Sequence, residues 1–227
     1  MIAVSSASFD ASFGRISRLC SDGQLREALQ LLHQMDQKGI SISRDIFYHL
    51  LQVCAKKRDL SIARQLQSYR IARDLRSVTV LGDHLIRIFV SCGNLHEANK
   101  VFMTVPKPSV YTWNAIISAY TKLGRYGKVF ALYKKMQERE EGNEGVNPSK
   151  VTFLYLLKAC GSIGALDKGM ELHDDIVHRG MIENHIVGNA LIDMYAKCGM
   201  VTRAREVFDN RSVWDIIAWN SLLTGYS

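Results

Sequence analysis

One long internal repeat constrains the fold of this chain more than any other feature of its sequence. Cys54 and Cys160 lie 106 positions apart, and so do Cys92 and Cys198. The same offset aligns Leu50-Leu51-Gln52-Val53-Cys54 with Leu156-Leu157-Lys158-Ala159-Cys160, and Trp113-Asn114 with Trp219-Asn220. So many matches at one offset do not arise from composition, and they indicate a protein built from stacked units.

Small residues divide each long repeat into shorter segments. Alanine or glycine recurs at positions 28, 63, 98, 169 and 204, with Val129 in the same role. After a short leader at 1–8, this register predicts the segments 9–43, 44–78, 79–109, 110–149, 150–184, 185–215 and a partial 216–227. The fourth segment is the longest because it contains an acidic insertion within 138–144, which we expect to form a solvated helix end or loop.

Apolar residues within a segment follow helical spacing. Trp113, Ile116, Ile117 and Tyr120 fall on one helix face, and Gly124 stands where that helix should end. A second stripe follows at Val129, Leu132, Tyr133 and Met136. Two antiparallel helices cannot bury their apolar faces alone, so neighbouring pairs must stack. The sequence therefore predicts an all-α fold, an α-solenoid of helix–turn–helix repeats.

Composition limits what such a solenoid can do. The chain has 29 lysines and arginines against 22 acidic residues, a net charge of +7 that is compatible with nucleic acid. Its five cysteines are odd in number and far apart, so we expect neither a disulfide framework nor a metal site. No run approaches the roughly 18 apolar residues of a membrane span. No catalytic constellation stands out, and we expect no cofactor and no enzymatic activity.

Three motifs carry a resemblance to a known family. Residues 187–199 resemble the short-type motif of plant pentatricopeptide repeat (PPR) proteins, and residues 113–120 resemble the standard-length motif. Residues 156–160, followed by Gly169, resemble the long-type motif. The order standard, long, short occurs twice, as in the PLS subclass of the family. The resemblance implies a right-handed α-solenoid superhelix over 9–227. Tetratricopeptide repeats are an alternative, but their uniform period of about 34 does not suit these segment lengths.

The resemblance also implies that the chain binds single-stranded RNA, with one base per repeat. In the family, the fifth and last residues of a segment (the reading pair) contact the base edge. Carried over, the reading pairs are Phe13 with Ser43, Tyr48 with Val78, Asp83 with Ser109, Asn114 with Ser149, Leu154 with Asn184, and Asn189 with Asp215, and Asn220 begins a seventh. The second residue packs on the base face, and in the later segments it is apolar or aromatic: Val80, Tyr111, Val151, Ile186 and Ile217. In the first two segments it is aspartate, at positions 10 and 45.

Asparagine at the fifth position is the strongest functional signal in the sequence. Asn114, Asn189 and Asn220 lie within apolar helical stripes, which a polar residue on a groove face explains better than the alternative, a helix cap. By the resemblance, Asn189 with Asp215 favours uridine. Asn114 with Ser149 favours a pyrimidine, with cytidine preferred. These residues predict a preference for pyrimidine-rich RNA.

The remaining reading pairs carry less information about the base. Tyr48 and Leu154 lie in long-type segments, where the family's base recognition is weak and these side chains offer little edge-specific hydrogen bonding. Asp83 with Ser109 departs from the common pairs of the family. The base preference of that repeat therefore stays open.

The positive charge is concentrated in the first half of the chain. Residues 1–109 carry 15 basic and 9 acidic side chains, whereas residues 110–227 carry 14 and 13. This excess predicts either a track that contacts RNA phosphates or an ordinary solvated helix face. The basic residues concerned are Lys56, Lys57, Arg58, Arg64, Arg70, Arg73 and Arg76.

The family resemblance also suggests a biological role. PLS proteins usually continue into C-terminal extension domains, often a deaminase, but the H-x-E and C-x-x-C patterns of that enzyme do not occur here. We therefore expect a recognition adaptor in RNA editing or processing in a mitochondrion or chloroplast, with a deaminase or other processing factor supplied in trans. The final segment stops after one helix, as a truncated product, a partial gene model or a chain with a partner at its end would do. The alternative function is a scaffold that binds protein.

Overall fold

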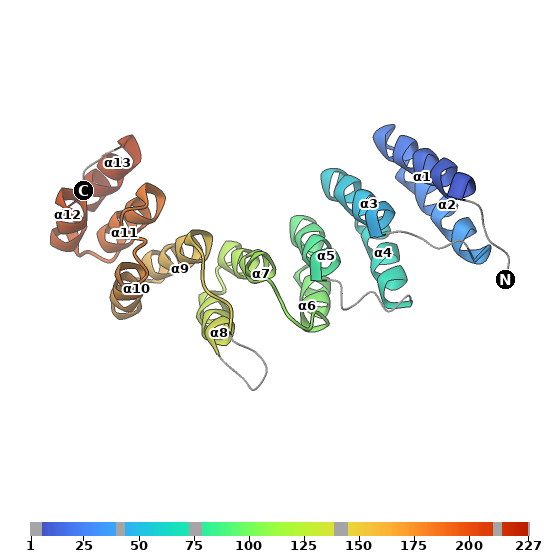
Figure 1. Cartoon of the computed structure of the whole chain (residues 1–227). Helices are drawn as coiled ribbons and strands as arrows, with labels where there is room; N and C mark the ends of the chain where they lie inside the picture. Colours follow the sequence, from blue (N-terminus) through green and yellow to red (C-terminus); the bar gives the residue numbers. More distant parts are fainter. Residues whose placement is uncertain (1–5, 40–43, 73–78, 139–144, 211–214, 227) are drawn as a thin grey trace. The chain divides into compact units, whose positions relative to one another are not determined.

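The computed structural model describes residues 6–39, 44–72, 79–138, 145–210 and 215–226, with side chains from Gly14 onward. These residues form thirteen α-helices and no strand, which confirms the all-α prediction (Figure 1). The helices are α1 (Ser6–Ser21), α2 (Leu25–Gln37), α3 (Arg44–Lys57), α4 (Leu60–Ala72), α5 (Thr79–Ser91), α6 (Leu95–Met103), α7 (Val110–Lys122), α8 (Tyr126–Gln137), α9 (Lys150–Ile163), α10 (Leu166–His178), α11 (His185–Lys197), α12 (Val201–Asp209) and α13 (Ile216–Gly225). Since α1 begins at Ser6, part of the expected leader is helical.

The chain divides into two compact units, Met1–Thr112 and Trp113–Ser227. In the first unit α1 packs against α3 and α3 against α5, so the odd-numbered helices form one layer. In the second unit α9 packs against α11 and α11 against α13 in the same manner. Each of α2, α4, α10 and α12 packs between the preceding helix and the next odd-numbered one (Figure 1). The odd-numbered helices are called first helices below, and the even-numbered ones second helices.

The turn between two helices of a pair is set by glycine. Helix α7 ends at Lys122, and Gly124 follows with a φ of +66°, a left-handed conformation that costs glycine little. The backbone N–H of Arg125 then donates to the carbonyl of Tyr120 at 2.9 Å, which satisfies one of the last carbonyls of the helix. The predicted stop at Gly124 is confirmed.

The recurring small residues lie where a second helix meets a first helix. Ala63, Ala98 and Ala204 are completely buried. Gly169 on α10 faces Met194 on α11 so closely that a Cβ atom at position 169 would lie 2.4 Å from the Met194 Sδ atom. Because interiors are packed this tightly, a larger side chain at these positions would push neighbouring helices apart.

Three of the five cysteines belong to the hydrophobic core. Cys20, Cys54 and Cys160 are buried, and Cys92 and Cys198 are partly exposed, all as free thiols. Burial raises the pKa of Cys54 and of Cys160 to about 12. Within the described ranges, His, Cys, Asp and Glu side chains nowhere gather in a group of three that could hold a metal ion. None of the described helices combines the length and the apolar character needed to cross a membrane.

Candidate nucleic-acid interface

The predicted fifth-position residues lie inside first helices. Asp83 is on α5, Asn114 on α7, Asn189 on α11 and Asn220 on α13. None of these four residues is the N-cap of its own helix, so the capping explanation of the asparagines does not apply. Each is the fifth residue of its helix, about one turn after the helix begins. From there its side chain can contact a residue at the start of the next repeat.

The predicted last residues lie at helix N-termini. Ser149, Asn184 and Asp215 are the N-caps of α9, α11 and α13, and each side chain accepts a backbone N–H of the first turn. Ser109 precedes α7, and its Oγ accepts the N–H of Thr112 at 3.2 Å. Capping of this kind contributes roughly 1 kcal/mol and fixes the position of the capping side chain. From these fixed positions, Ser109, Ser149 and Asp215 hydrogen-bond to the fifth residues of their segments.

Asn189 and Asp215, the predicted reading pair of segment 185–215, are hydrogen-bonded to each other. The Nδ2 atom of Asn189 donates to both carboxylate oxygens of Asp215, at 2.9 and 2.7 Å. The carboxylate also accepts the N–H of Ala218 at 2.9 Å, as the cap of α13. Asn189 is only 6% exposed, whereas Asp215 is partly exposed. A ligand therefore reaches the edge of the carboxylate more readily than the amide.

Asn114, Ser149 and Thr152 form a closed hydrogen-bonded group, called the Asn114 cluster. The Nδ2 atom of Asn114 donates to Ser149 Oγ at 3.0 Å, and its Oδ1 atom accepts from Thr152 Oγ1 at 2.7 Å. The Thr152 hydroxyl in turn accepts the backbone N–H of Ser149 at 3.0 Å. These bonds fix which way the amide of Asn114 points.

Asp83, Ser109 and Thr112 form an equivalent group in the first unit, called the Asp83 cluster. The carboxylate of Asp83 accepts the hydroxyl of Ser109 at 2.8 Å and also the hydroxyl of Thr112. The backbone N–H of Ser109 donates to Thr112 Oγ1 at 3.1 Å. Burial raises the pKa of Asp83, while the Ser109 hydroxyl and the positive charge of Arg87 oppose that rise.

The two threonines are site residues that the sequence reasoning missed. Thr112 and Thr152 are the third residues of their segments and are completely buried. Each closes a cluster that joins the fifth residue of one repeat to the start of the next. A signal for them was present, because each stands three residues after a serine, the spacing of a capping box.

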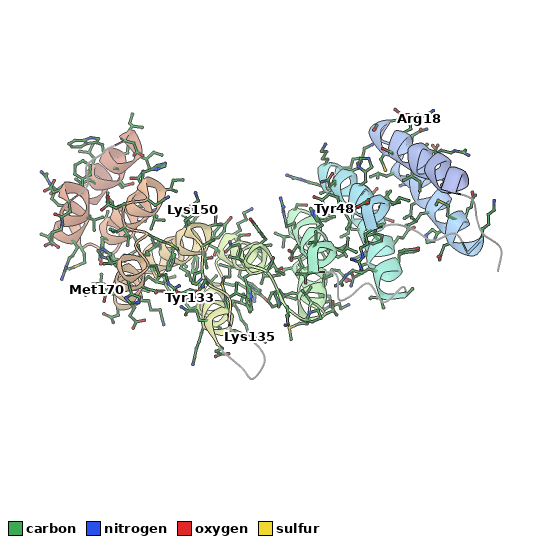
Figure 2. The ribbon with its side chains drawn as sticks, viewed as in Figure 1. Arg18, Tyr48, Tyr133, Lys135, Lys150 and Met170 are labelled. Atoms are coloured by element: carbon green, nitrogen blue, oxygen red, sulfur yellow. The ribbon has the colours of Figure 1, made fainter. Side chains whose placement is uncertain are left out.

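The other reading pairs are less well defined. Leu154 is half-buried on α9, and Asn184 caps α11 with its side chain. Asn220 is exposed on α13. Tyr48 lies on α3 (Figure 2). Its ring packs edge-on against the ring of His84, with centroids 4.8 Å apart. Ser43, Val78 and the side chain of Phe13 lie outside the described residues, and so does residue stretch 139–144 of the acidic insertion.

The predicted second residues share one property, which is solvent exposure. Although all five are apolar or aromatic, between 37% and 72% of each side chain is accessible. Scattered exposed apolar residues are normal on a protein surface, but recurrence at one position of five successive repeats is not scatter. The five are Val80 (52%), Tyr111 (72%), Val151 (37%), Ile186 (40%) and Ile217 (59%).

The basic residues of the first unit divide into two groups. Lys56, Arg58 and Arg64 are exposed on α3, just after it and on α4. Arg70 is completely buried, and its Nη1 atom donates to Thr104 Oγ1 at 3.2 Å, so including Arg70 in a phosphate track was wrong. Burying its long side chain against the following repeat stabilises the stack instead. Arg73 and Arg76 lie outside the described residues.

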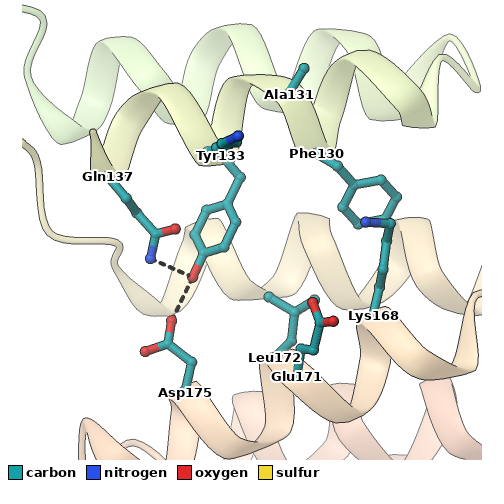
Figure 3. A pocket seen from close by; sticks show the side chains of 9 residues that line it. Phe130, Ala131, Tyr133, Gln137, Lys168, Glu171, Leu172 and Asp175 are labelled. Carbon is teal, nitrogen blue, oxygen red and sulfur yellow. Dashed lines mark hydrogen bonds between the residues drawn. The ribbon is translucent and has the colours of Figure 1, made fainter.

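A pocket of about 500 Å³ lies between the second helices α8 and α10 (Figure 3). There the hydroxyl of Tyr133 donates to Asp175 at 2.5 Å and accepts from Gln137 at 3.1 Å. Asp175 also pairs with Arg179 at 2.6 Å. Burial and the bond to Asp175 raise the pKa of Tyr133. These polar groups bond to one another and join α8 to α10. We therefore interpret the pocket as a contact between neighbouring repeats, separate from the reading pairs on the first helices.

Three family descriptions match the sequence. The PPR repeat family matches residues 108–162, and the pentatricopeptide repeat domain matches residues 30–69 and 73–122. The PPR repeat matches residues 15–40, 151–181 and 189–210. Together the matched stretches include residues of every helix from α1 to α12.

Proteins of Arabidopsis thaliana are similar to the chain over most of its length. A chloroplastic pentatricopeptide repeat-containing protein is 39% identical over 193 residues, which cover 84% of this chain and 36% of that protein. A mitochondrial pentatricopeptide repeat-containing protein is 33% identical over 203 residues, which cover 88% of this chain and 29% of that protein. The chain thus spans only about a third of the length of these relatives.

Solved structures show the same fold. The crystal structure of the pentatricopeptide repeat protein PPR10 from maize superimposes with a TM-score of 0.70 at 20% identity, covering 94% of this chain and 31% of that one. The same protein in complex with an 18-nt psaJ RNA element gives a TM-score of 0.53. These likenesses confirm the α-solenoid prediction. The matched family descriptions, the similar Arabidopsis proteins and the paired helices together show that this chain belongs to the pentatricopeptide repeat family.

Proposed function

We propose that the chain binds single-stranded RNA along its first helices, with one base per repeat. In this proposal each segment, from 9–43 to the partial 216–227, binds one base, and successive segments bind successive bases. The chain acts as a recognition adaptor in RNA editing or processing, with any catalytic activity supplied by another factor. The PLS order of motifs supports the editing role.

The observation that carries the proposal is the recurring combination of an exposed apolar residue and a capped polar pair. A base has an apolar face and a polar edge, and it binds where a protein offers both at once. Ile186, 40% exposed, can cover a base face beside the pair Asn189 and Asp215. Stacking and apolar contact of this kind contribute about 1–3 kcal/mol per base.

The geometry of the Asn189 and Asp215 pair supports a preference for uridine. The Asp215 carboxylate is partly exposed and can accept the N3–H of uracil, which is the one donor on the Watson–Crick edge of that base. Asn189, being buried, holds the carboxylate in place through bonds of 2.9 and 2.7 Å. For the Asn114 cluster we propose a pyrimidine, with cytidine preferred.

The relatives support a location for this activity. The Arabidopsis proteins that the chain resembles are named as chloroplastic or mitochondrial. We propose that this chain acts on transcripts of one of these organelles. The exposed basic side chains of the first unit, such as Lys56 and Arg64, would add salt-dependent attraction to phosphates.

A titration of the purified chain tests the proposal. Pyrimidine-rich single-stranded RNA, double-stranded RNA and DNA are compared at fixed salt, with the chain and with Asn189→Ala. We expect preference for single-stranded RNA, and about a tenfold loss in the variant for RNA with uridine at the matching position. Asn210→Ala, an exposed position after α12, serves as the control and should bind like the parent. Equal binding of all three nucleic acids, or none, would favour a protein-binding scaffold instead.

A further inference from the structure

The Asp83 cluster and the Asn114 cluster are built alike but differ in one atom of the fifth residue. Both have serine at the helix start and threonine three residues later, and in both the threonine hydroxyl donates to the fifth residue. Where Asn114 has an NH₂ group, Asp83 has an oxygen. This single difference reverses the direction of the bond to serine, because Asn114 donates to Ser149 while Asp83 accepts from Ser109.

The hydrogen atoms of the Asp83 cluster all point inward. The Ser109 and Thr112 hydroxyls both donate to the carboxylate. The backbone N–H groups of the same two residues donate to each other's hydroxyl oxygens, at 3.1 and 3.2 Å. Asp83 and Ser109 are partly exposed and Thr112 is completely buried. What the cluster offers to a ligand is therefore the lone pairs of the Asp83 carboxylate and of Ser109 Oγ, without a donor.

The Asn114 cluster, in contrast, offers hydrogen-bond donors to a ligand. An amide nitrogen has two hydrogens, and Asn114 uses one of them on Ser149, which leaves the second for a ligand. Since Ser149 Oγ accepts that bond, its own hydrogen is held only by a 3.3 Å contact with Thr152 Oγ1. The cluster can therefore donate to the carbonyl oxygen and ring nitrogen acceptors that pyrimidines carry on their edges.

From this difference we infer that the repeat containing Asp83 selects guanine. The inference rests on the proposed RNA-binding function and assigns the repeat whose preference the sequence left open. Guanine is the base whose Watson–Crick edge has two adjacent donors, N1–H and N2–H, which match the two oxygens of a carboxylate. Adenine, cytosine and uracil each have a single donor group on this edge, next to a ring nitrogen lone pair or between two carbonyls. The Asp83 carboxylate accepts two bonds from its cluster, one on each oxygen, so each oxygen can take one further donor, and only guanine supplies two. The Asp215 carboxylate already accepts three bonds from Asn189 and Ala218, so the single N3–H of uracil suffices there.

The apolar residues around the Asp83 cluster fit a purine. Val80 lies one helical turn before Asp83 on the same helix and is 52% exposed. Tyr111 lies two residues after Ser109 and is 72% exposed, which makes it the most accessible of the five second residues. A purine has a larger face than a pyrimidine and gains more from stacking on an exposed aromatic ring.

A selection from a short randomised single-stranded RNA pool tests the inference. The parent chain, Asp83→Asn and Asn114→Asp each enrich RNAs, which are then sequenced. The position at which Asp83→Asn alters the selected base identifies the matching nucleotide. Four synthetic RNAs that differ only there then give the affinities. We expect the parent to bind the guanine RNA about tenfold more tightly than the other three.

The two variants are reciprocal controls. Asp83→Asn converts its cluster into the composition of the Asn114 cluster, so we expect the preference to change from guanine to a pyrimidine. Asn114→Asp should gain guanine at its own position. Urea unfolding of all three chains checks that they fold equally well. A parent chain that enriches RNA but carries a pyrimidine or no preference at the Asp83-dependent position overturns the guanine inference alone. A parent that enriches no RNA overturns the proposed function.

Discussion

Thr152→Val should separate the two roles of the buried threonine in the Asn114 cluster. Valine has the shape of threonine but replaces the hydroxyl with a methyl group. The Ser149 N–H then loses its 3.0 Å bond and Asn114 Oδ1 loses its 2.7 Å bond. Two lost bonds of this kind cost about 2 kcal/mol in the free energy of unfolding, because neither group is fully open to water. The amide of Asn114 also becomes free to turn over.

The assay compares urea unfolding and RNA binding in three variants. Thr152→Ser keeps the hydroxyl and should retain the pyrimidine preference of the parent, at the cost of one buried methyl group. Thr152→Val should lose that preference. Thr121→Val is the control, since the Thr121 hydroxyl donates only to the carbonyl of Ile117 in its own helix, at 2.9 Å. If Thr152→Val discriminated between bases as well as the parent does, the hydroxyl would not orient Asn114 and the reasoning would be refuted.

Three further predictions concern individual positions. Asp215→Ala removes both the cap of α13 and the partner of Asn189, and should destabilise the second unit by about 2 kcal/mol in urea unfolding; an unchanged midpoint would contradict it. Gly124→Ala forces alanine to a φ of +66° and should cost about 1 kcal/mol, whereas Gly127→Ala, within α8, should not destabilise. Cys160, with its pKa raised to about 12 by burial, should resist alkylation at pH 8 in the folded chain and react after unfolding, as mass spectrometry would show.

The sequence predicts the helices well because they follow from local patterns. The apolar stripe of α7 and the stop at Gly124 are set by residues only a few positions apart. The exposure of the second residues follows from their place at helix starts, as for Tyr111 and Ile186.

Contacts between repeats are harder to predict, because they join residues about one repeat apart. Thr152 reaches Asn114 across 38 positions, and no pattern within a single segment indicates that bond. Arg70 was expected on a charged surface, yet it is buried against Thr104, 34 positions away. Asn189 was expected to be accessible, but it is only 6% exposed and its amide is hydrogen-bonded to Asp215, 26 positions away.

The central claim is that RNA lies on the first helices, and a matched pair of variants tests it most directly. Ile186 at the start of α11 and Val177 near the end of α10 are 40% and 50% exposed, so each tolerates a polar replacement. Affinities for single-stranded pyrimidine-rich RNA are measured for Ile186→Gln and Val177→Gln. We predict about a tenfold loss for Ile186→Gln and parental affinity for Val177→Gln. Equal losses, or a loss at Val177 alone, would place the RNA elsewhere and contradict the account.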